Sequence, residues 1–206
     1  TDTVMSQLLD GLAASGGRAL PMTESLLQRI SRKDNPQILI GAFGQRWHVL
    51  QEVSETSDNI WVALDRVRDP GNLGTVMRTA DAVGAAGIIL VGACTDPYSV
   101  EAVRASMGSV FNVKIIICSE AEFITFGANW SGRVIGAAPS AAVDYRQADY
   151  NGSLIMLMGN EQAGLTPPLM DMCEQLIEIP MQGRSDSLNL AVATGVALYT
   201  ALDRRP

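Results

Sequence analysis

The sequence predicts an α/β fold in which a parallel sheet is flanked by helices. From residue 60 onward, short apolar runs alternate with segments of helical periodicity, which is typical of a parallel sheet with helices on both faces. In the first such unit, the apolar run Ile60–Leu64 leads through a turn into a segment where Val76, Ala80 and Val83 share one helical face. The chain has 206 residues, enough for one domain with a sizeable core and a small appendage.

The first 56 residues are predicted to form a small separate unit with a linker, and residues 57–206 the main domain. Thr1–Arg32 has helical periodicity in two pieces, which the pair Gly16 and Gly17 divides. Further along, Ile38–Phe43 is predicted as a strand and His48–Glu55 as a short extended segment. The polar residues 54–59 mark the expected domain boundary.

The main domain is predicted to alternate strands with helices. Asp69-Pro70-Gly71-Asn72 is expected to form a turn, because proline fixes φ and Asp and Asn bond back to nearby amides. The strands are expected at Ile60–Leu64, Ile88–Val91, Val113–Cys118, Val134–Ala137, Ser153–Met158 and Leu176–Ile179. The helices are expected at Thr75–Val83, Tyr98–Ala105, Ala121–Phe126, Leu165–Cys173 and Leu188–Leu202.

Composition limits the classes of partner. The formal net charge is -7, so no global basic field draws this chain to nucleic acid. Nearly all positive charge is arginine, which suits bidentate phosphate contacts, so a local arginine-lined surface is compatible with an acidic chain. The first residues lack the pattern of a signal peptide, and no apolar run is long enough to span a bilayer.

Cysteine usage favours a reduced, cytoplasmic protein without a metal site. Cys94, Cys118 and Cys173 are odd in number and widely spaced, and the sequence has no C-x-x-C pair or Cys/His cluster. His48 is the single histidine and lies outside the polar motifs. A reaction assigned to this chain therefore has to proceed without a histidine base or use His48.

Three polar turns each follow a predicted strand, where open α/β sheets bind ligands. They read N-x-G-x-x-x-R at Asn72–Arg78, G-x-E-x-x-G-L at Gly159–Leu165, and I-P-M…S-L-N at Ile179–Asn189. In this order and spacing they resemble the SpoU (TrmH) family of RNA ribose methyltransferases, within the SPOUT class. Val103–Gly108 also matches a family segment, and Leu26–Phe43 resembles the end of the family's N-terminal substrate-binding domain.

The resemblance implies a specific fold and activity. The expected fold adds a C-terminal trefoil knot that forms the S-adenosylmethionine (SAM) pocket, a rare exception to unknotted chains. The expected reaction is SAM-dependent methylation of a ribose 2′-hydroxyl in tRNA or rRNA by a homodimer, without a metal. Residues 1–56 are then a remnant of an RNA substrate-binding domain with its linker, and residues 57–206 the SPOUT methyltransferase domain.

The same resemblance assigns site residues. Those expected in catalysis are Asn72, Arg78, Glu161, Ser187 and Asn189. Those expected to bind SAM are Leu157, Gly159, Asn160, Gly164, Ile179, Met181, Leu188 and Asn189. Those expected to contact RNA are Arg78, Arg104 and Ser106.

The chemistry leaves the role of Arg78 open between two readings. A ribose 2′-hydroxyl is a poor nucleophile, so the enzyme has to align it with the methyl donor and assist loss of its proton. A guanidinium is a poor base, because its pKa is above about 12. Arg78 either takes the proton, with its charge destabilised by the sulfonium or a dry pocket, or orients the hydroxyl and an adjacent phosphate.

Other site residues also have two readings. Glu161 is expected to bond Asn72, Arg78 or the following helix, where the dipole alone favours a carboxylate. Gly159 is expected to let the backbone approach a ligand closely. Asn72, Asn189 and Arg104 have the plain alternatives of turn and surface residues.

Competing classes lack their motifs. A nucleotide-binding dehydrogenase needs G-x-G-x-x-G after a strand, and a serine hydrolase needs G-x-S-x-G; neither occurs. A non-catalytic RNA-binding protein that keeps the knotted fold is the remaining alternative. The presence of Arg78, Gly159 and Asn189 favours the enzyme.

The last predicted helix favours a homodimer. Its apolar residues surround much of the helix, which therefore needs cover on more than one face. One face is expected to pack on its own sheet and another on the same helix of a partner. These residues are Leu188, Ala191, Val192, Gly195, Val196, Tyr199 and Leu202.

Overall fold

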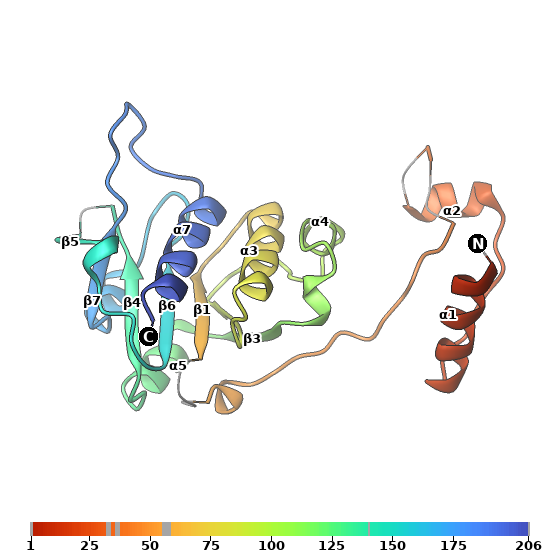
Figure 1. Cartoon of the computed structure of the whole chain (residues 1–206), viewed down its shortest axis with the longest axis horizontal. Helices are drawn as coiled ribbons and strands as arrows, with labels where there is room; N and C mark the ends of the chain where they lie inside the picture. The colour runs from red at the N-terminus through yellow and green to blue at the C-terminus, as the bar shows by residue number, and fades with distance from the viewer. Residues whose placement is uncertain (1, 32–33, 36–37, 55–58, 140, 206) are drawn as a thin grey trace. The chain divides into compact units, whose positions relative to one another are not determined.

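A computed structural model describes residues 2–31, 34–35, 38–54, 59–139 and 141–205 of the chain. The chain divides into two compact units, Thr1–Gly44 and Gln45–Pro206 (Figure 1). The predicted boundary between residues 56 and 57 lies outside the described residues. The second unit begins earlier than that boundary because the segment before it already packs on the sheet: Val53 is buried in the core beside β1.

The first unit contains two helices, α1 (Asp2–Ala14) and α2 (Glu24–Ser31). As predicted, they are separated near the glycine pair, where Gly16 takes a left-handed φ of 76°. The predicted strand at Ile38–Phe43 is wrong. Its described residues have no strand partner and remain exposed, at 74% for Ile38 and 71% for Phe43. An apolar run forms a strand only where another strand accepts its hydrogen bonds.

The second unit is built on a seven-stranded sheet in the order β3-β2-β1-β6-β4-β7-β5, and each of its strand pairs is parallel. This confirms the predicted α/β class. Every residue of β1, β2 and β6 is buried, as expected for strands covered on both faces. The strands are β1 (Ile60–Asp65), β2 (Gly87–Val91), β3 (Lys114–Cys118), β4 (Arg133–Ala137), β5 (Val143–Asp144), β6 (Leu154–Met158) and β7 (Gln175–Glu178).

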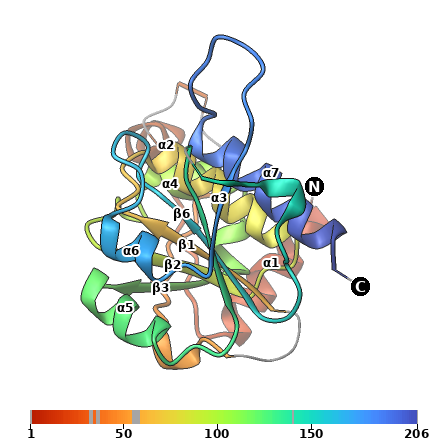
Figure 2. The ribbon, with the colours of Figure 1, turned by 90° about the vertical axis from the view of Figure 1, so that its left-hand side faces the viewer.

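Helices cover both faces of this sheet (Figure 2). Because side chains alternate along a strand, Val62 and Leu64 join the core beneath α3 and α7, whereas Trp61 and Ala63 join the core beneath α5 and α6. The helices are α3 (Pro70–Ala82), α4 (Val100–Ala105), α5 (Glu120–Gly127), α6 (Pro167–Asp171) and α7 (Leu190–Asp203). Short 3₁₀ helices lie at η1 (Leu50–Glu52), η2 (Ser109–Phe111) and η3 (Tyr145–Gln147).

The segment before η1 extends the edge of the sheet. His48 forms an isolated parallel bridge with Ile116 of β3, and its N–H donates to the carbonyl oxygen of Ile115 at 3.0 Å. Tyr98 holds the chain two residues before His48, since its hydroxyl bonds the backbone of Arg46. The predicted extended segment is therefore confirmed at His48, while the residues after it form η1.

Two helices begin differently from the prediction. Pro70–Asn72 is the first turn of α3 rather than a separate turn, because Asp69 caps the helix by accepting from the Asn72 N–H at 2.6 Å. Helix α7 begins at Leu190, after the cap Asn189. The strand β5 escaped prediction because two residues carry no periodicity.

The order of the strands determines where the C-terminal segment runs. The connection that leads from β4 to β6 contains β5. Because β7 lies between β4 and β5 in the sheet, this later strand lies inside that connection. The chain then crosses a long loop, visible in Figures 1 and 2, and returns as α7 against α3. This return brings the start of α7 to the carboxyl edge of β1 and β6.

Candidate functional site

The three motifs meet at the carboxyl ends of β1 and β6. These ends are adjacent because Leu64 pairs with Met158 in the sheet register. The residues that follow β1 and β6, together with the cap of α7, surround an open cleft of about 790 Å³. Its lining residues are Arg66, Arg68, Asp69, Asn72, Asn160, Glu161, Gln162, Ala163 and Asn189.

A chain of three side chains links one residue from each motif. Asn189 Nδ2 donates to Asn72 Oδ1 at 2.9 Å, and Asn72 Nδ2 donates to Glu161 Oε1 at 3.2 Å. These contacts join residues far apart in sequence, which the motif order alone did not predict. The three predicted residues therefore form one connected polar group beside the cleft.

Glu161 also supports the entry to α3. Its carboxylate accepts from the N–H groups of Arg68 at 3.4 Å and Asp69 at 3.5 Å. The sequence left three partners open for Glu161, and the structure selects Asn72 and the backbone before α3 rather than Arg78. The carboxylate thus fixes the segment that leads from β1 into α3.

The loop after β6 is closed by its own contacts. The backbones of Asn160 and Gly164 exchange hydrogen bonds at 3.2 and 3.0 Å. Asn160 Oδ1 accepts from the N–H groups of Gln162 and Ala163, both at 3.0 Å. A Cβ atom on Gly159 would lie 2.5 Å from the backbone N of Leu165. Gly159 therefore allows the chain to approach itself, and its predicted close approach to a ligand stays a prediction.

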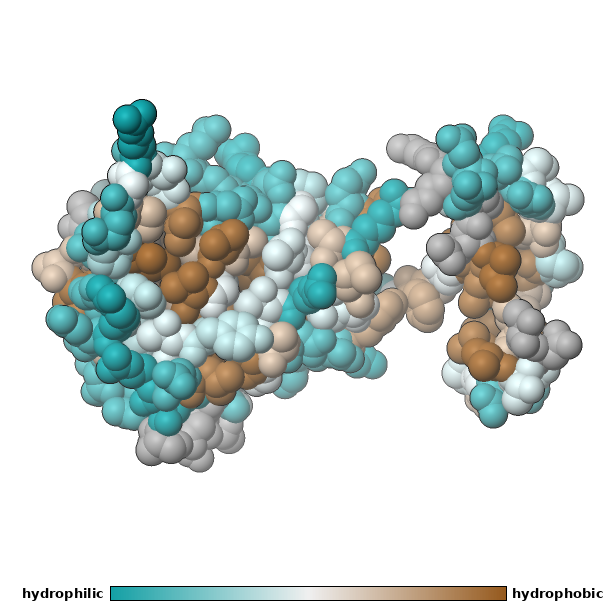
Figure 3. Space-filling view, turned by 45° about the horizontal axis from the view of Figure 1, so that its top comes forward, coloured by the Kyte–Doolittle hydropathy of each residue, from teal (hydrophilic) through white to brown (hydrophobic). Residues whose placement is uncertain are grey.

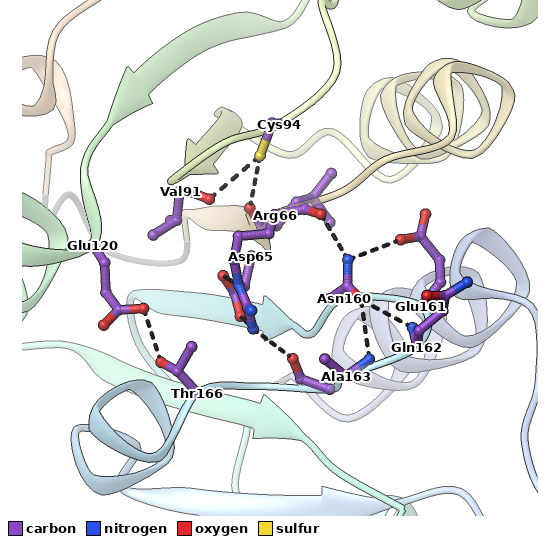
Figure 4. A network of polar contacts seen from close by, with 12 residues as sticks. Asp65, Arg66, Val91, Cys94, Glu120, Asn160, Glu161, Gln162, Ala163 and Thr166 are labelled. Atoms are coloured by element: carbon purple, nitrogen blue, oxygen red, sulfur yellow. Dashed lines mark hydrogen bonds and ion pairs between the residues drawn. The ribbon is translucent and has the colours of Figure 1, made fainter.

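A second polar group connects this loop to β1 (Figure 4). Arg66 pairs with the buried carboxylate of Asp65, and its Nη2 donates to the Gly164 carbonyl oxygen at 3.1 Å. Neither residue was among the predicted site residues. The available signal was their position, since charged residues directly after a buried strand lie at the ligand edge of the sheet.

Several predicted residues do not line the cleft. Arg78 is exposed on α3, and its guanidinium has no hydrogen bond or ion pair with the described residues. The Leu157 side chain is fully buried in the core, so only its backbone is available to a ligand. Arg104 is exposed on α4. Ser106 is fully buried and donates to the Val103 carbonyl oxygen at 2.8 Å, which argues against the predicted RNA contact.

The third motif presents unused backbone groups. Residues 179–188 make no hydrogen bond with other described residues, so their N–H and C=O groups are free to bind a ligand. Ile179 and Met181 are half-buried, while Ser187 and Leu188 are exposed. This loop and the cleft offer an apolar wall, backbone donors and acceptors, and polar side chains at one edge. That combination fits a nucleoside with a polar tail, as in SAM.

The Cys94 thiol, which donates to the Leu64 carbonyl oxygen in β1, is a poor nucleophile. Burial raises the pKa of Cys94 to about 11, so the neutral thiol prevails at physiological pH. In the described ranges, no three His, Cys, Asp or Glu side chains gather as a metal site. None of the helices described is long and apolar enough to cross a membrane.

A parallel sheet of this order, with three polar motif loops meeting at its carboxyl edge, defines a methyltransferase of the SPOUT class. Residues 59–199 match the SpoU rRNA Methylase family. Because this match covers more than half of the sequence, the chain belongs to that family. Membership implies the predicted trefoil knot, and the position of β7 inside the β4–β6 connection agrees with it.

Known relatives agree with this assignment. A 23S rRNA (guanosine-2′-O-)-methyltransferase from Ralstonia nicotianae is 32% identical over 99% of this chain and 84% of its own length. A 23S rRNA (uridine(2479)-2′-O)-methyltransferase from Streptomyces viridochromogenes is 30% identical over 90% of this chain and 67% of its own. The AdoMet-bound rRNA methyltransferase from Sinorhizobium meliloti has a similar structure, with a TM-score of 0.92, 47% identity, and coverage of 96% and 76% of the two chains.

Proposed function

We propose that this chain transfers the methyl group of SAM to a ribose 2′-hydroxyl of ribosomal RNA. The observation that carries the proposal is the polar chain Asn189–Asn72–Glu161, which joins all three family motifs beside one cleft. Two of the similar proteins described above act on 23S rRNA by name, which favours rRNA over tRNA.

The residues that would hold SAM lie on two loops. Backbone groups of Ile179, Met181 and Leu188 are available for its adenine and ribose, and the Gly159–Leu165 loop for its methionine portion. When bound, SAM supplies an electrophilic methyl group on a sulfonium. The chain itself has to place the acceptor hydroxyl in line and exclude competing water.

Arg78 is suited to orient the acceptor. It lies on α3, whose first turn is fixed by Asn72, Glu161 and the Asp69 cap. Its exposed guanidinium has the donors to bind an RNA phosphate and the 2′-hydroxyl together. Of the two readings we therefore assign Arg78 the orienting role, because its donors match a phosphate and a hydroxyl.

We further propose a homodimer through α7. Val192 and Tyr199, two turns apart on one face, are each 53% exposed, and Leu202 is 45% exposed. Figure 3 shows apolar surface in this region of the unit. By contrast, Ala191 and Ala197 are buried in the protein's own core. An apolar stripe opposite the core face is suited to a second copy of the helix.

The remaining assignments follow from the family. We assign residues 1–56 to a remnant of an RNA substrate-binding domain and its linker, the location to the cytoplasm, and the reaction to a metal-free mechanism.

Methyl transfer to RNA tests the proposal directly. The protein is incubated with methyl-labelled SAM and with total RNA from a strain that lacks it, and the modified nucleotide is mapped. We expect label in a 2′-O-methyl nucleotide of rRNA. Labelled tRNA alone would contradict the rRNA assignment. RNA binding without transfer, under conditions where SAM binds, would establish the non-catalytic alternative.

A further inference from the structure

Arg66 contacts the Gly159–Leu165 loop from two directions. Its backbone carbonyl oxygen accepts from Asn160 Nδ2 at 2.8 Å, and its guanidinium Nη2 donates to the Gly164 carbonyl oxygen at 3.1 Å. We propose that Arg66 is a positioning residue that joins this loop to β1 and fixes it for cofactor binding. The identity of the cofactor in this inference rests on the proposed function, whereas the contacts of Arg66 do not depend on it.

The guanidinium is itself held rigidly. Arg66 Nε donates to Asp65 Oδ1 and Nη2 to Asp65 Oδ2, both at 2.8 Å. Asp65 is 1% exposed, and a buried carboxylate requires such a partner. A bidentate pair restricts the planar guanidinium to one orientation. The contact with Gly164 therefore starts from a fixed group instead of a freely rotating surface arginine.

Arg66 has a strained backbone conformation, and the contacts of its side chain give a reason why an arginine is kept there. Its φ is 47°, in the left-handed region that the Cβ atom disfavours. Its N–H donates to the Val91 carbonyl oxygen at 2.9 Å, so both backbone groups of Arg66 are bonded. Glycine adopts this conformation without strain but carries no guanidinium. An arginine here keeps the strained turn and gains the contact with Gly164.

The contacts of Arg66 reach both ends of a loop that is already closed. Asn160 and Gly164 exchange backbone hydrogen bonds, and Arg66 binds one group on each of them. The loop therefore has little freedom to tilt as a unit relative to β1. Glu161, which lies inside the loop, is thereby kept facing Asn72.

The test removes the pair and measures the loop. In the double variant D65N/R66N, asparagine tolerates the left-handed backbone at position 66 but cannot reach Gly164. We expect hydrogen exchange of the amides of residues 160–164, measured without cofactor, to rise about 10-fold. We also expect the Kd for SAM to rise about 10-fold in calorimetry, because the loop is no longer held in place before the cofactor binds.

The matched control is Arg146→Asn. Arg146 also forms a bidentate pair, with Asp144 at 2.9 and 2.5 Å, but makes no contact with the loop. It should leave both loop exchange and SAM affinity unchanged. Equal changes in the control and the double variant would overturn the inference, because they would show a general effect on stability.

A conservative variant tests the same contact if the double variant does not fold. Arg66→Lys keeps the charge beside Asp65 but lacks the fork that binds Asp65 and Gly164 together. We expect intermediate increases in exchange and Kd. Wild-type values for both in Arg66→Lys and in any folded double variant would overturn the inference. A wild-type protein that does not bind SAM would instead overturn the proposed function, while the exchange measurement would still test the contacts.

Discussion

Asn189 combines two structural roles that substitution can separate. Its Oδ1 caps α7 by accepting from the Ala191 N–H at 2.9 Å, and its Nδ2 donates to Asn72 at 2.9 Å. Asn189→Ala removes both. Loss of an N-cap costs about 1 kcal/mol, and loss of a hydrogen bond about another 1 kcal/mol. We therefore expect the free energy of unfolding to fall by about 2 kcal/mol.

Asn189→Asp removes only one of the two roles. The carboxylate still caps α7, and its charge is favoured at the helix N-terminus. It has no donor for Asn72 Oδ1, and it places a negative charge near Glu161. Since the cap remains, the free energy of unfolding should fall by only about 1 kcal/mol, the cost of the lost hydrogen bond to Asn72. Methyl transfer should fall about 10-fold or more, because Asn72 and Glu161 lose their arrangement.

Urea unfolding and single-turnover methyl transfer measure the two effects. Ser119→Ala, which removes the N-cap of α5, is the control for cap loss away from the polar chain. It should cost about 1 kcal/mol and leave transfer by the folded protein unchanged. Wild-type transfer by Asn189→Asp would refute the reasoning that the Asn72–Asn189 contact organises the site. Wild-type stability of Asn189→Ala would refute the magnitude assigned to the cap.

Four further predictions address other parts of the molecule. Arg78→Ala should bind SAM with unchanged affinity in calorimetry yet lose methyl transfer; equal loss of both would place Arg78 in the cofactor pocket. Tyr199→Asp should convert the dimer to a monomer in light scattering at micromolar concentration, and a wild-type monomer that methylates RNA would contradict the interface. Gly159→Ala should lower the thermal unfolding midpoint as well as SAM binding, because its Cβ collides with the Leu165 backbone; unchanged stability with blocked binding would favour the ligand-approach role. Burial raises the pKa of Cys94 to about 11 and of Cys173 to about 12, above the ordinary 9.0. Because the unfolded chain loses these protons at lower pH than the folded protein, the urea concentration at the midpoint of unfolding should fall as pH rises from about 9 toward 12. A midpoint that does not change with pH would contradict this.

The sequence alone predicted the parallel sheet and the placement of the three motifs at the ligand edge of that sheet. Apolar runs such as Leu154–Met158 are buried on both faces, and such runs are typical of parallel strands. Motif order also identified Asn72, Glu161 and Asn189 as neighbours in function. Their bonding pattern did not follow from sequence, because it depends on the register of β1 against β6 and on the return of α7.

Residues outside periodic patterns were less predictable. Ile38–Phe43 has strand composition, but strand formation depends on a partner that this chain does not supply in its described part. Arg66 has no distinctive neighbours in sequence, and its role depends on a backbone angle and on Gly164, far along the chain. Ser106 lies in a family segment, yet the packing of α4 on α3 buries it, since a Cβ on Gly74 would lie 2.9 Å from its backbone N.

The bond between Asn72 and Asn189 spans 117 positions of sequence, and this distance has a consequence for folding. Parallel pairing of β1 with β6 is also non-local, so loop-closure entropy opposes both until most of the chain has been synthesised. A nascent chain that ends before α7 contains the first two motifs but cannot close the cleft. Catalytic competence should therefore appear at the final step of folding, and cofactor binding should report completion of the whole sheet. Partly folded chains that meet RNA would therefore carry no methylating activity.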